Sequence, residues 1–351
     1  CFFIIFPCSS RKATIMLLLR DITTNTFSDG EMMSLLTIWL AAITDLFWGD
    51  PNYRYHPVRI IGNVITFIEE KLRQRYFGDK ALKTAGILLT TSVVISTYVI
   101  TYLALSISAQ ISELLSTFIA IFLIYSFLAL QSLVDAANGI YYSLKNEPIA
   151  QTRHKLSMIV GRDTQQLNEQ QITKATVETV AENSVDGVIA PLFFLFIGGV
   201  PLMAAYKAIN TLDSMVGYQN SHYKAIGWCS AKLDDIANYI PARLSLLFIT
   251  ASALLLKLDY KNAWKIGRRD CYQHKSPNSA WSEATVAGAL NIQLGGGNYY
   301  HGIYVDKPTI GDDIHPVQIE HIKQTNHLIY GACTIALVSF TLIFLAVQFI
   351  F

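Results

Sequence analysis

Residues 84–134 read TAGILLTTSVVISTYVITYLALSISAQISELLSTFIAIFLIYSFLALQSLV, and this stretch decides the fold class. Its one charged residue, Glu113, divides it into two uncharged runs. A helix needs about 20 residues to cross a hydrocarbon core of about 30 Å, and each run is long enough. We therefore expect two adjacent membrane-spanning helices joined by a short connection around Glu113.

The rest of the chain repeats this pattern. Two further uncharged runs cover residues 187–206 and 328–351, and weaker candidates at 32–48 and 240–256 contain Asp45 and Arg243, respectively. Only 15% of the residues are charged, against about 25% in an average soluble protein. The sequence therefore predicts an all-α, polytopic integral membrane protein with about 4–6 hydrophobic helices and large polar loops.

Lysine and arginine residues predict which side of the membrane the loops occupy. Stretches 49–84, 135–187 and 257–327 contain seven, five and eight of them, whereas the connection at Glu113 contains none. The positive-inside rule places these three stretches in the cytoplasm. We expect a multi-pass protein of the cell (inner) membrane, with its active site on the cytoplasmic side.

Residues 188–206 leave part of the topology open, because Pro191, Gly198, Gly199 and Pro201 weaken a regular helix. If this segment spans the membrane, the polar stretch 207–239 lies outside, away from the other loops. If this segment and residues 240–256 are re-entrant or broken, all the polar loops can share one face, and irregular backbone is tolerated where it lines a cavity. We favour the shared face.

Composition argues against several classes of site. The net charge of +1 provides no basic surface for nucleic acid. The five cysteines are scattered without a Cys-x-x-Cys pair, which argues against a zinc site and a disulfide framework. We interpret residues 1–33 as an N-terminal extension without function, and residues 34–351 as a single membrane-embedded domain.

The first polar cluster is Asp45-Leu-Phe-Trp-Gly-Asp50-Pro-Asn, which His56 and Arg59 follow. A guanidinium group offers a planar fork that matches carboxylate and phosphate oxygens. We therefore predict that His56 and Arg59 bind an anionic group of the substrate. The alternative is a membrane-exit turn at Asp50 with an interfacial arginine.

The second cluster places Lys174, Glu178, Glu182 and Asp186 four residues apart, on one slowly drifting helix face. The stripe runs into an uncharged segment, where acidic groups are costly without partners or a metal. Magnesium is usually held by one or two carboxylates and substrate phosphates. We predict Glu178, Glu182 and Asp186 as its ligands. The alternative is a solvated face with a Lys174–Glu178 pair.

The third cluster contains Lys207, Asn210 and Asp213, which recur every three residues on neighbouring helical positions. A lysine beside Asn and Asp at a membrane boundary is suited to phosphate and a metal ion. The alternative is a hydrogen-bonded helix end capped by Gly217.

The fourth cluster contains adjacent carboxylates, Asp234 and Asp235, which point in different directions on a helix. Asp234 and Asn238, four residues apart, are the expected pair. A catalytic role for Asp234 and simple interfacial anchoring fit this pattern equally well.

The fifth cluster contains His274, Ser276, Asn278 and Glu283, followed by Gly295-Gly-Gly-Asn298. Glycines let backbone amides approach an anion, so we predict substrate binding by Ser276, Asn278 and Asn298. The alternative is a flexible surface loop. The run is neither a Walker loop nor a dinucleotide-binding fingerprint. Together, the five clusters indicate a membrane enzyme that handles anionic, phosphate-bearing substrates with a divalent metal.

Taken in order, these clusters resemble the cobalamin-biosynthesis membrane proteins called CobD or CbiB, the adenosylcobinamide-phosphate synthases. The matching words run collinearly from residue 34 to about residue 350: DLFWGDP with HPVR, ETVAENSVDG, YKAINTLDSMVGY, KLDD, and SPN through GGGNYY. Ala280 and Ser282 depart from the family, where we expect Gly and Pro, and we place both in a loop.

The resemblance implies ATP-dependent amide formation between adenosylcobyric acid and (R)-1-amino-2-propanol or its O-phosphate, with Mg²⁺. The product is adenosylcobinamide or its phosphate. The implied partners are the corrinoid, the amine, the lipid bilayer and other late cobalamin-pathway membrane enzymes, and no nucleic acid. We assign hypothetical catalytic roles to Lys207, Asp213 and Asp234, substrate binding also to Asn210, and metal binding to the acidic stripe.

Two other functions compete with this interpretation. Asn210-x-x-Asp213 is similar to the Asp-rich motifs of membrane prenyltransferases that bind Mg-diphosphate, and Asp234-Asp235 fits a second such motif only loosely. A non-enzymatic transporter or corrinoid-binding scaffold predicts charged groups at the middle of the membrane, whereas the charges here cluster at the helix ends.

Overall fold

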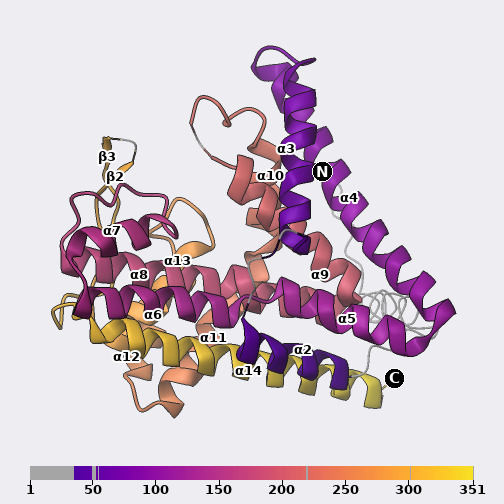
Figure 1. The fold of residues 1–351 in the computed structure, drawn as a ribbon. Coiled ribbons are helices and arrows are strands. Elements are labelled where there is room, and N and C mark those ends of the chain that lie inside the picture. The colour runs from indigo at the N-terminus through magenta and orange to yellow at the C-terminus, as the bar shows by residue number, and fades with distance from the viewer. Residues whose placement is uncertain (1–34, 50–52, 54, 219, 301, 351) are drawn as a thin grey trace, which may run out of the picture.

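The computed structural model describes residues 35–49, 53, 55–218, 220–300 and 302–350. The predicted N-terminal extension and residues 50–52 of the first cluster lie outside these ranges. The described part is almost entirely helical (Figure 1), and four of its helical segments are long and apolar enough to cross a membrane: Asp79–Ile111, Glu113–Asn146, Glu169–Val216 and Glu320–Ile350. The pair Trp228–Ala237 and Tyr239–Leu255, bent by 43°, would make a fifth. The predicted helical membrane fold is confirmed.

The elements follow one another along the chain as labelled in Figure 1. They are α2 (Leu35–Trp48), α3 (Pro57–Arg73), α4 (Asp79–Ile111), α5 (Glu113–Phe127), α6 (Leu130–Asn146), α7 (Ile149–Ser157), α8 (Glu169–Ser184), the π-helix η1 (Val185–Ile189), α9 (Ala190–Val216), α10 (Trp228–Ala237), α11 (Tyr239–Leu255), α12 (Tyr260–Asp270), α13 (Ser279–Leu290), β1 (Leu294–Gly295), β2 (Asn298–Tyr300), β3 (Ile303–Val305), β4 (Thr309–Ile310) and α14 (Glu320–Ile350).

The first of the two uncharged runs in residues 84–134 forms most of α4, and the second forms α5 and the start of α6. Helices α4 and α5 separate at Ser112, whose extended backbone (φ −165°, ψ 131°) cannot continue a helix. Near its start, α4 lies so close to the main chain after α9 that a Cβ on Gly86 would sit 1.9 Å from the Ile226 carbonyl oxygen. Only glycine fits at this crossing.

The first polar cluster closes the break between α5 and α6. Asp45 is 2% exposed, and its Oδ2 accepts a hydrogen bond from the Leu130 amide at 3.1 Å. The Ala129 amide donates to the Gly187 carbonyl at 3.1 Å. These bonds satisfy backbone donors at the start of α6, which would otherwise be unpaired, and they attach the break to η1.

Helix α9 folds back on itself at Gly198 and Gly199. Both have non-helical backbone angles, and Gly199 has φ +69° and ψ −168°, a conformation that essentially only glycine adopts. The ring of Phe194 stacks on that of Tyr206 at 4.9 Å. A continuous helix would separate residues 12 positions apart by about 18 Å. The segment is therefore a broken helix that forms a hairpin, and residues 207–216 return towards the end of α8. Its re-entrant position in the membrane stays a prediction.

Helices α6, α8 and α14 run side by side through the body of the molecule (Figure 1). Smaller elements, including α7, α13 and the β2–β3 hairpin, gather at one end of these helices. Two short antiparallel pairs occur there, β1 with β4 and β2 with β3. Helix α13 packs against α12 at Gly288, where a Cβ would lie 2.5 Å from the Asn262 carbonyl oxygen.

Candidate functional site

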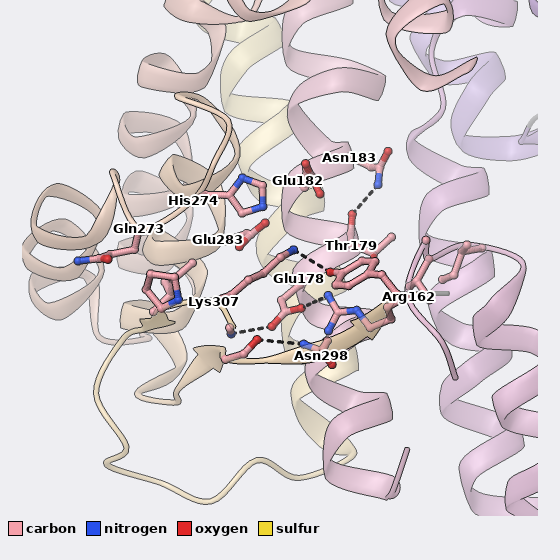
Figure 2. Close-up of a pocket in the computed structure, with 18 residues that line it drawn as sticks. Arg162, Glu178, Thr179, Glu182, Asn183, Gln273, His274, Glu283, Asn298 and Lys307 are labelled. Atoms are coloured by element: carbon pink, nitrogen blue, oxygen red, sulfur yellow. Dashed lines mark hydrogen bonds and ion pairs between the residues drawn. The ribbon is translucent and has the colours of Figure 1, made fainter. Parts of the chain in front are cut away.

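An open cleft with a volume of about 170 Å³ lies between the C-terminal half of α8 and the segments that surround α13. Figure 2 shows its polar lining, which comes from α8, α13, the loop after α7, the loop after α12 and the β1–β4 region. These segments are far apart in the sequence. The charged residues and the histidine in the lining are Arg162, Glu178, Glu182, His274, Glu283 and Lys307.

Glu178 forms one wall of the cleft through two partners. Its Oε2 accepts from the Arg162 guanidinium at 2.5 Å, and its Oε1 accepts from the Gly295 amide at 2.7 Å. Burial alone would lower the pKa of Arg162, but the Glu178 carboxylate outweighs it and raises that pKa. The alternative Lys174–Glu178 pair is wrong, and the Gly295 amide donates to a side chain of the protein.

Glu182, one turn further along α8, and His274, in the loop after α12, both face the cleft (Figure 2). Glu182 Oε1 accepts a hydrogen bond from Ser279 Oγ at 2.7 Å. The Ser276 amide donates to His274 Nδ1 at 3.1 Å, so Nδ1 carries no proton and Nε2 is the N–H of the neutral ring. Burial lowers the pKa of His274 despite the nearby Glu182 carboxylate, and this favours the same neutral form.

Glu283 lies in α13, and its side chain opens on the cleft beside these groups. It is 5% exposed. Burial, together with the carboxylates of Glu182 and Glu178, raises the pKa of Glu283 well above its usual range. Ala280 and Ser282, which we placed in a loop, lie in this helix as well and are completely buried. Their small side chains fit a helix packed on all sides.

Lys307 and Asn298 complete the opposite wall. Lys307 Nζ donates to Tyr300 Oη at 2.7 Å and lies 4.8 Å from the centre of its ring. Asn298 donates to the Gly296 carbonyl at 3.0 Å. The glycine run belongs to β1 and the turn that leads into β2, and the Gly296 amide donates to the Pro308 carbonyl at 3.1 Å.

A second polar group forms where the two limbs of the α9 hairpin meet α10. Asp186 of η1 interacts electrostatically with Lys207 and Asp213, which the fold-back of α9 brings to it, and with Asp234 of α10. The predicted pair is confirmed, since Asn238 donates to Asp234 Oδ2 at 3.0 Å. A π-helix at this point is typical of functional sites. The arrangement gathers acidic groups and a lysine beside an apolar segment, where charges without partners are costly.

The loop before α13 connects the cleft to this second group. Ser276 Oγ lies 3.5 Å from Asp235 Oδ1, and Asn278 Nδ2 donates to the Asp235 carbonyl at 2.9 Å. The side-chain oxygen Oδ1 of Asn278 accepts a hydrogen bond from the Arg243 guanidinium at 3.3 Å. Ser276 and Asn278 therefore hold α10 against the cleft, and both polar groups share one end of the bundle.

His56 and Arg59 do not line the cleft. The His56 ring is buried and packs edge-on against Tyr53 at 5.3 Å, while Arg59 is exposed on α3. Helix α3 packs against the last turns of α9, where a Cβ on Gly62 would lie 3.3 Å from the Met215 sulfur. The predicted anion-binding pair thus lies beside the helix that carries the second polar group.

The metal-binding prediction is only partly matched by the placement of its residues. Glu178 is committed to Arg162 and Gly295, which leaves Glu182 and Asp186 of the stripe. Within the described ranges, no three His, Cys, Asp or Glu side chains form a group that could hold a metal ion. The donors present are hard oxygen ligands, which suit Mg²⁺ together with phosphate oxygens. The magnesium site stays a prediction, and the solvated-face alternative is wrong because Glu178 is buried.

The sequence clusters predicted no roles for Arg162, His274, Glu283 and Lys307. Glu283 carried a usable signal, since it is the only charged residue of the α13 sequence SAWSEATVAGAL. A single carboxylate among small and apolar residues is expensive to bury. Arg162 and Lys307 carried no comparable signal, because both lie in polar loops.

Comparison with known proteins gives a consistent result. A family model described as CobD/Cbib protein matches residues 38–329. A protein of Salmonella arizonae named cobalamin biosynthesis protein CbiB is 49% identical over 88% of this chain and 97% of its own. One of Yersinia enterocolitica, named cobalamin biosynthesis protein CobD, is 50% identical over 88% of this chain and 98% of its own. No solved structure matches.

Proposed function

This chain belongs to the CobD/CbiB family, and from that premise we propose that it is the amide-forming enzyme of cobalamin biosynthesis. The reaction joins a propionate carboxylate of adenosylcobyric acid to (R)-1-amino-2-propanol or its O-phosphate, with ATP as co-substrate. A role in cobalamin biosynthesis, and with it a corrinoid substrate, follows from the names of the relatives. The amide-forming reaction and the identity of the amine are what we propose in addition.

The observation that supports this proposal is that four of the polar clusters lie close together. The α9 fold-back and the loop before α13 bring the second, third, fourth and fifth clusters to one end of the membrane helices. Residues more than a hundred positions apart in the sequence are in direct contact, such as the Gly295 amide and the Glu178 carboxylate. An enzyme that joins two substrates needs two adjacent polar sites, and the cleft and the group around Asp186 are adjacent.

The chemistry requires activation of a carboxylate, which is a poor electrophile in water. Mg-ATP would supply a phosphorylated, activated carboxylate. Asp186 and Asp213 would hold the metal with phosphate oxygens completing its shell. Lys207 would stabilise negative charge on the phosphoryl group, where catalysis rests on positioning and electrostatics.

We place the reaction at the cytoplasmic side of the inner membrane, where ATP is available. The Lys/Arg-rich stretches 49–84, 135–187 and 257–327 support this orientation. Two of these stretches supply Arg162 and Lys307 to the cleft, so the site and the positive loops belong to the same side.

The test is a turnover assay on purified protein in nanodiscs with adenosylcobyric acid, Mg-ATP and either amine, read by mass spectrometry of the corrinoid. We expect an ATP-dependent product heavier than the acid by the amine minus water. Asp213→Asn should lower turnover at least a hundredfold, whereas Glu147→Gln, at an exposed ion pair with Lys155, should not. Absence of product with both amines from folded protein would refute the ligase and favour the diphosphate-binding alternative.

A further inference from the structure

Helix α13 contributes one carboxylate, that of Glu283, to the lining of the cleft, and most of the helix is buried. Every residue from Ser282 to Leu290 is buried, because Gly288 and Gly267 allow α12 and α13 to pack in direct contact. A helix held on all sides gives Glu283 little freedom to reach solvent. Its carboxyl group therefore stays at the cleft.

Glu283 has no hydrogen bond or ion pair with any of the residues that the structure describes. A carboxyl group that is 95% buried normally has such a partner, since an unsatisfied one costs free energy. The cleft is the direction from which a partner can arrive, because Glu283 is part of its lining. This unpartnered group points to a ligand that supplies hydrogen-bond donors.

The charges that face Glu283 indicate the sign of that ligand. Glu178 and Glu182 of α8 act on it as like charges, and Arg162 and Lys307 as opposite charges. Arg162 is bound to Glu178, and Lys307 donates to a tyrosine hydroxyl on the far wall. His274 beside it is neutral with Nδ1 accepting from the main chain. The floor around Glu182 and Glu283 is thus acidic and suited to a small cation.

A primary ammonium group fits this floor better than a metal ion. It offers three N–H donors, and Glu283 and Glu182 present carboxylate acceptors. The proposed magnesium ion is assigned to Asp186 and Asp213 and does not require Glu283. Resting on the proposed amide-forming function, we propose that the cleft binds the ammonium group of the amine substrate and that Glu283 accepts the proton which the nitrogen must lose before it can attack.

The proton balance of this step is simple. The ammonium R–NH₃⁺ and the Glu283 carboxylate become R–NH₂ and a carboxylic acid. The nitrogen lone pair then forms the C–N bond to the activated carboxyl carbon, and the C–O bond to the phosphate leaving group breaks. That oxygen leaves with the electron pair, and phosphate takes the second proton from the nitrogen.

Burial makes this transfer favourable. In a low-dielectric site the charged ammonium–carboxylate pair is disfavoured relative to the neutral amine and acid. Burial and the Glu178 and Glu182 carboxylates raise the pKa of Glu283, so it is a stronger base than a solvated glutamate. A base whose pKa lies nearer the working pH is a more effective general base.

The test compares wild type, Glu283→Gln and the Glu147→Gln control in nanodiscs, with kcat and KM measured for the amine between about pH 6.5 and 9.5. General-base catalysis is worth about 10²–10⁴-fold, so Glu283→Gln should lose at least a hundredfold in kcat near neutral pH. Part of this loss should return as the pH rises, because solution then supplies neutral amine. Hydroxylamine, which is already neutral near pH 7, should be used by Glu283→Gln within about tenfold of wild type.

Two results would overturn the inference. One is unchanged kcat and pH profile in Glu283→Gln. The other is an equal loss with both nucleophiles at every pH, which would mean that Glu283 only supports the structure. Glu283→Asp separates these cases further, since a shortened base should keep the wild-type shape of the pH profile at lower kcat. If wild type itself forms no amide with any amine, the proposed function fails.

Discussion

Glu178→Gln tests whether the buried ion pair holds the wall of the cleft. Glutamine keeps the shape of the side chain and an oxygen that can accept from the Gly295 amide. It removes the negative charge beside Arg162, whose side chain is only 13% exposed. Removing one partner of a buried pair costs about 3–5 kcal/mol because the other charge is left uncompensated. Since the cleft admits water to Arg162, we expect the lower end, about 3 kcal/mol, or a factor of about 100 in the folded-to-unfolded ratio.

The assay is thermal and denaturant unfolding in detergent micelles, followed by circular dichroism. Glu147→Gln is the matched control, because its pair with Lys155 is exposed, and it should leave the transition in place. Arg162→Met combined with Glu178→Gln should be more stable than Glu178→Gln alone, since no unpaired charge remains. A Glu178→Gln transition that coincides with the control, or strictly additive effects in the double variant, would refute the reasoning.

Three further predictions concern the hairpin, the cleft and acid stability. Gly199→Ala should lower stability by about 1–3 kcal/mol, because its φ of +69° at ψ −168° suits only glycine; an unchanged melting curve would contradict the fold-back geometry. Lys307→Ala removes the ammonium group that donates to Tyr300 in the cleft wall. If this ammonium attracts the substrate phosphate, KM should rise about tenfold for the O-phosphate amine but little for the free amino alcohol. Equal effects on both amines would show that Lys307 does not bind the phosphate. Burial would raise the pKa of Asp270, but bonds from Arg269 and the main chain outweigh it and lower that pKa. This group therefore stabilises the fold above its unfolded pKa of about 3.9, and the stabilisation is lost as the pH falls through the folded pKa. The stability gap between wild type and Asp270→Asn should be full at neutral pH and should close in acid, whereas a gap that widens in acid would contradict this sign.

The helices and their membrane character followed from the sequence alone. Uncharged runs of about 20 residues or more are a local property, and only a helix satisfies the backbone of such a run in lipid. The break at Ser112 and the weakness at Gly198 and Gly199 were equally local, because a charge or a glycine pair acts on its own segment. The family resemblance also needed no structure, since five collinear words are read directly from the order of residues.

Only the tertiary structure decided which helix faces and loops pack against one another. The four-residue spacing places Glu178 and Glu182 on one face of α8, but it cannot say that Arg162 and Gly295 occupy Glu178. A buried charge must find a partner, and that partner can come from any loop. The sequence of α13 marks Glu283 as an unusual carboxylate, but only the tertiary structure places it in the cleft beside Glu178 and Glu182. Helical periodicity constrains the direction of a side chain relative to its own helix, whereas a site depends on where separate helices bring such directions together.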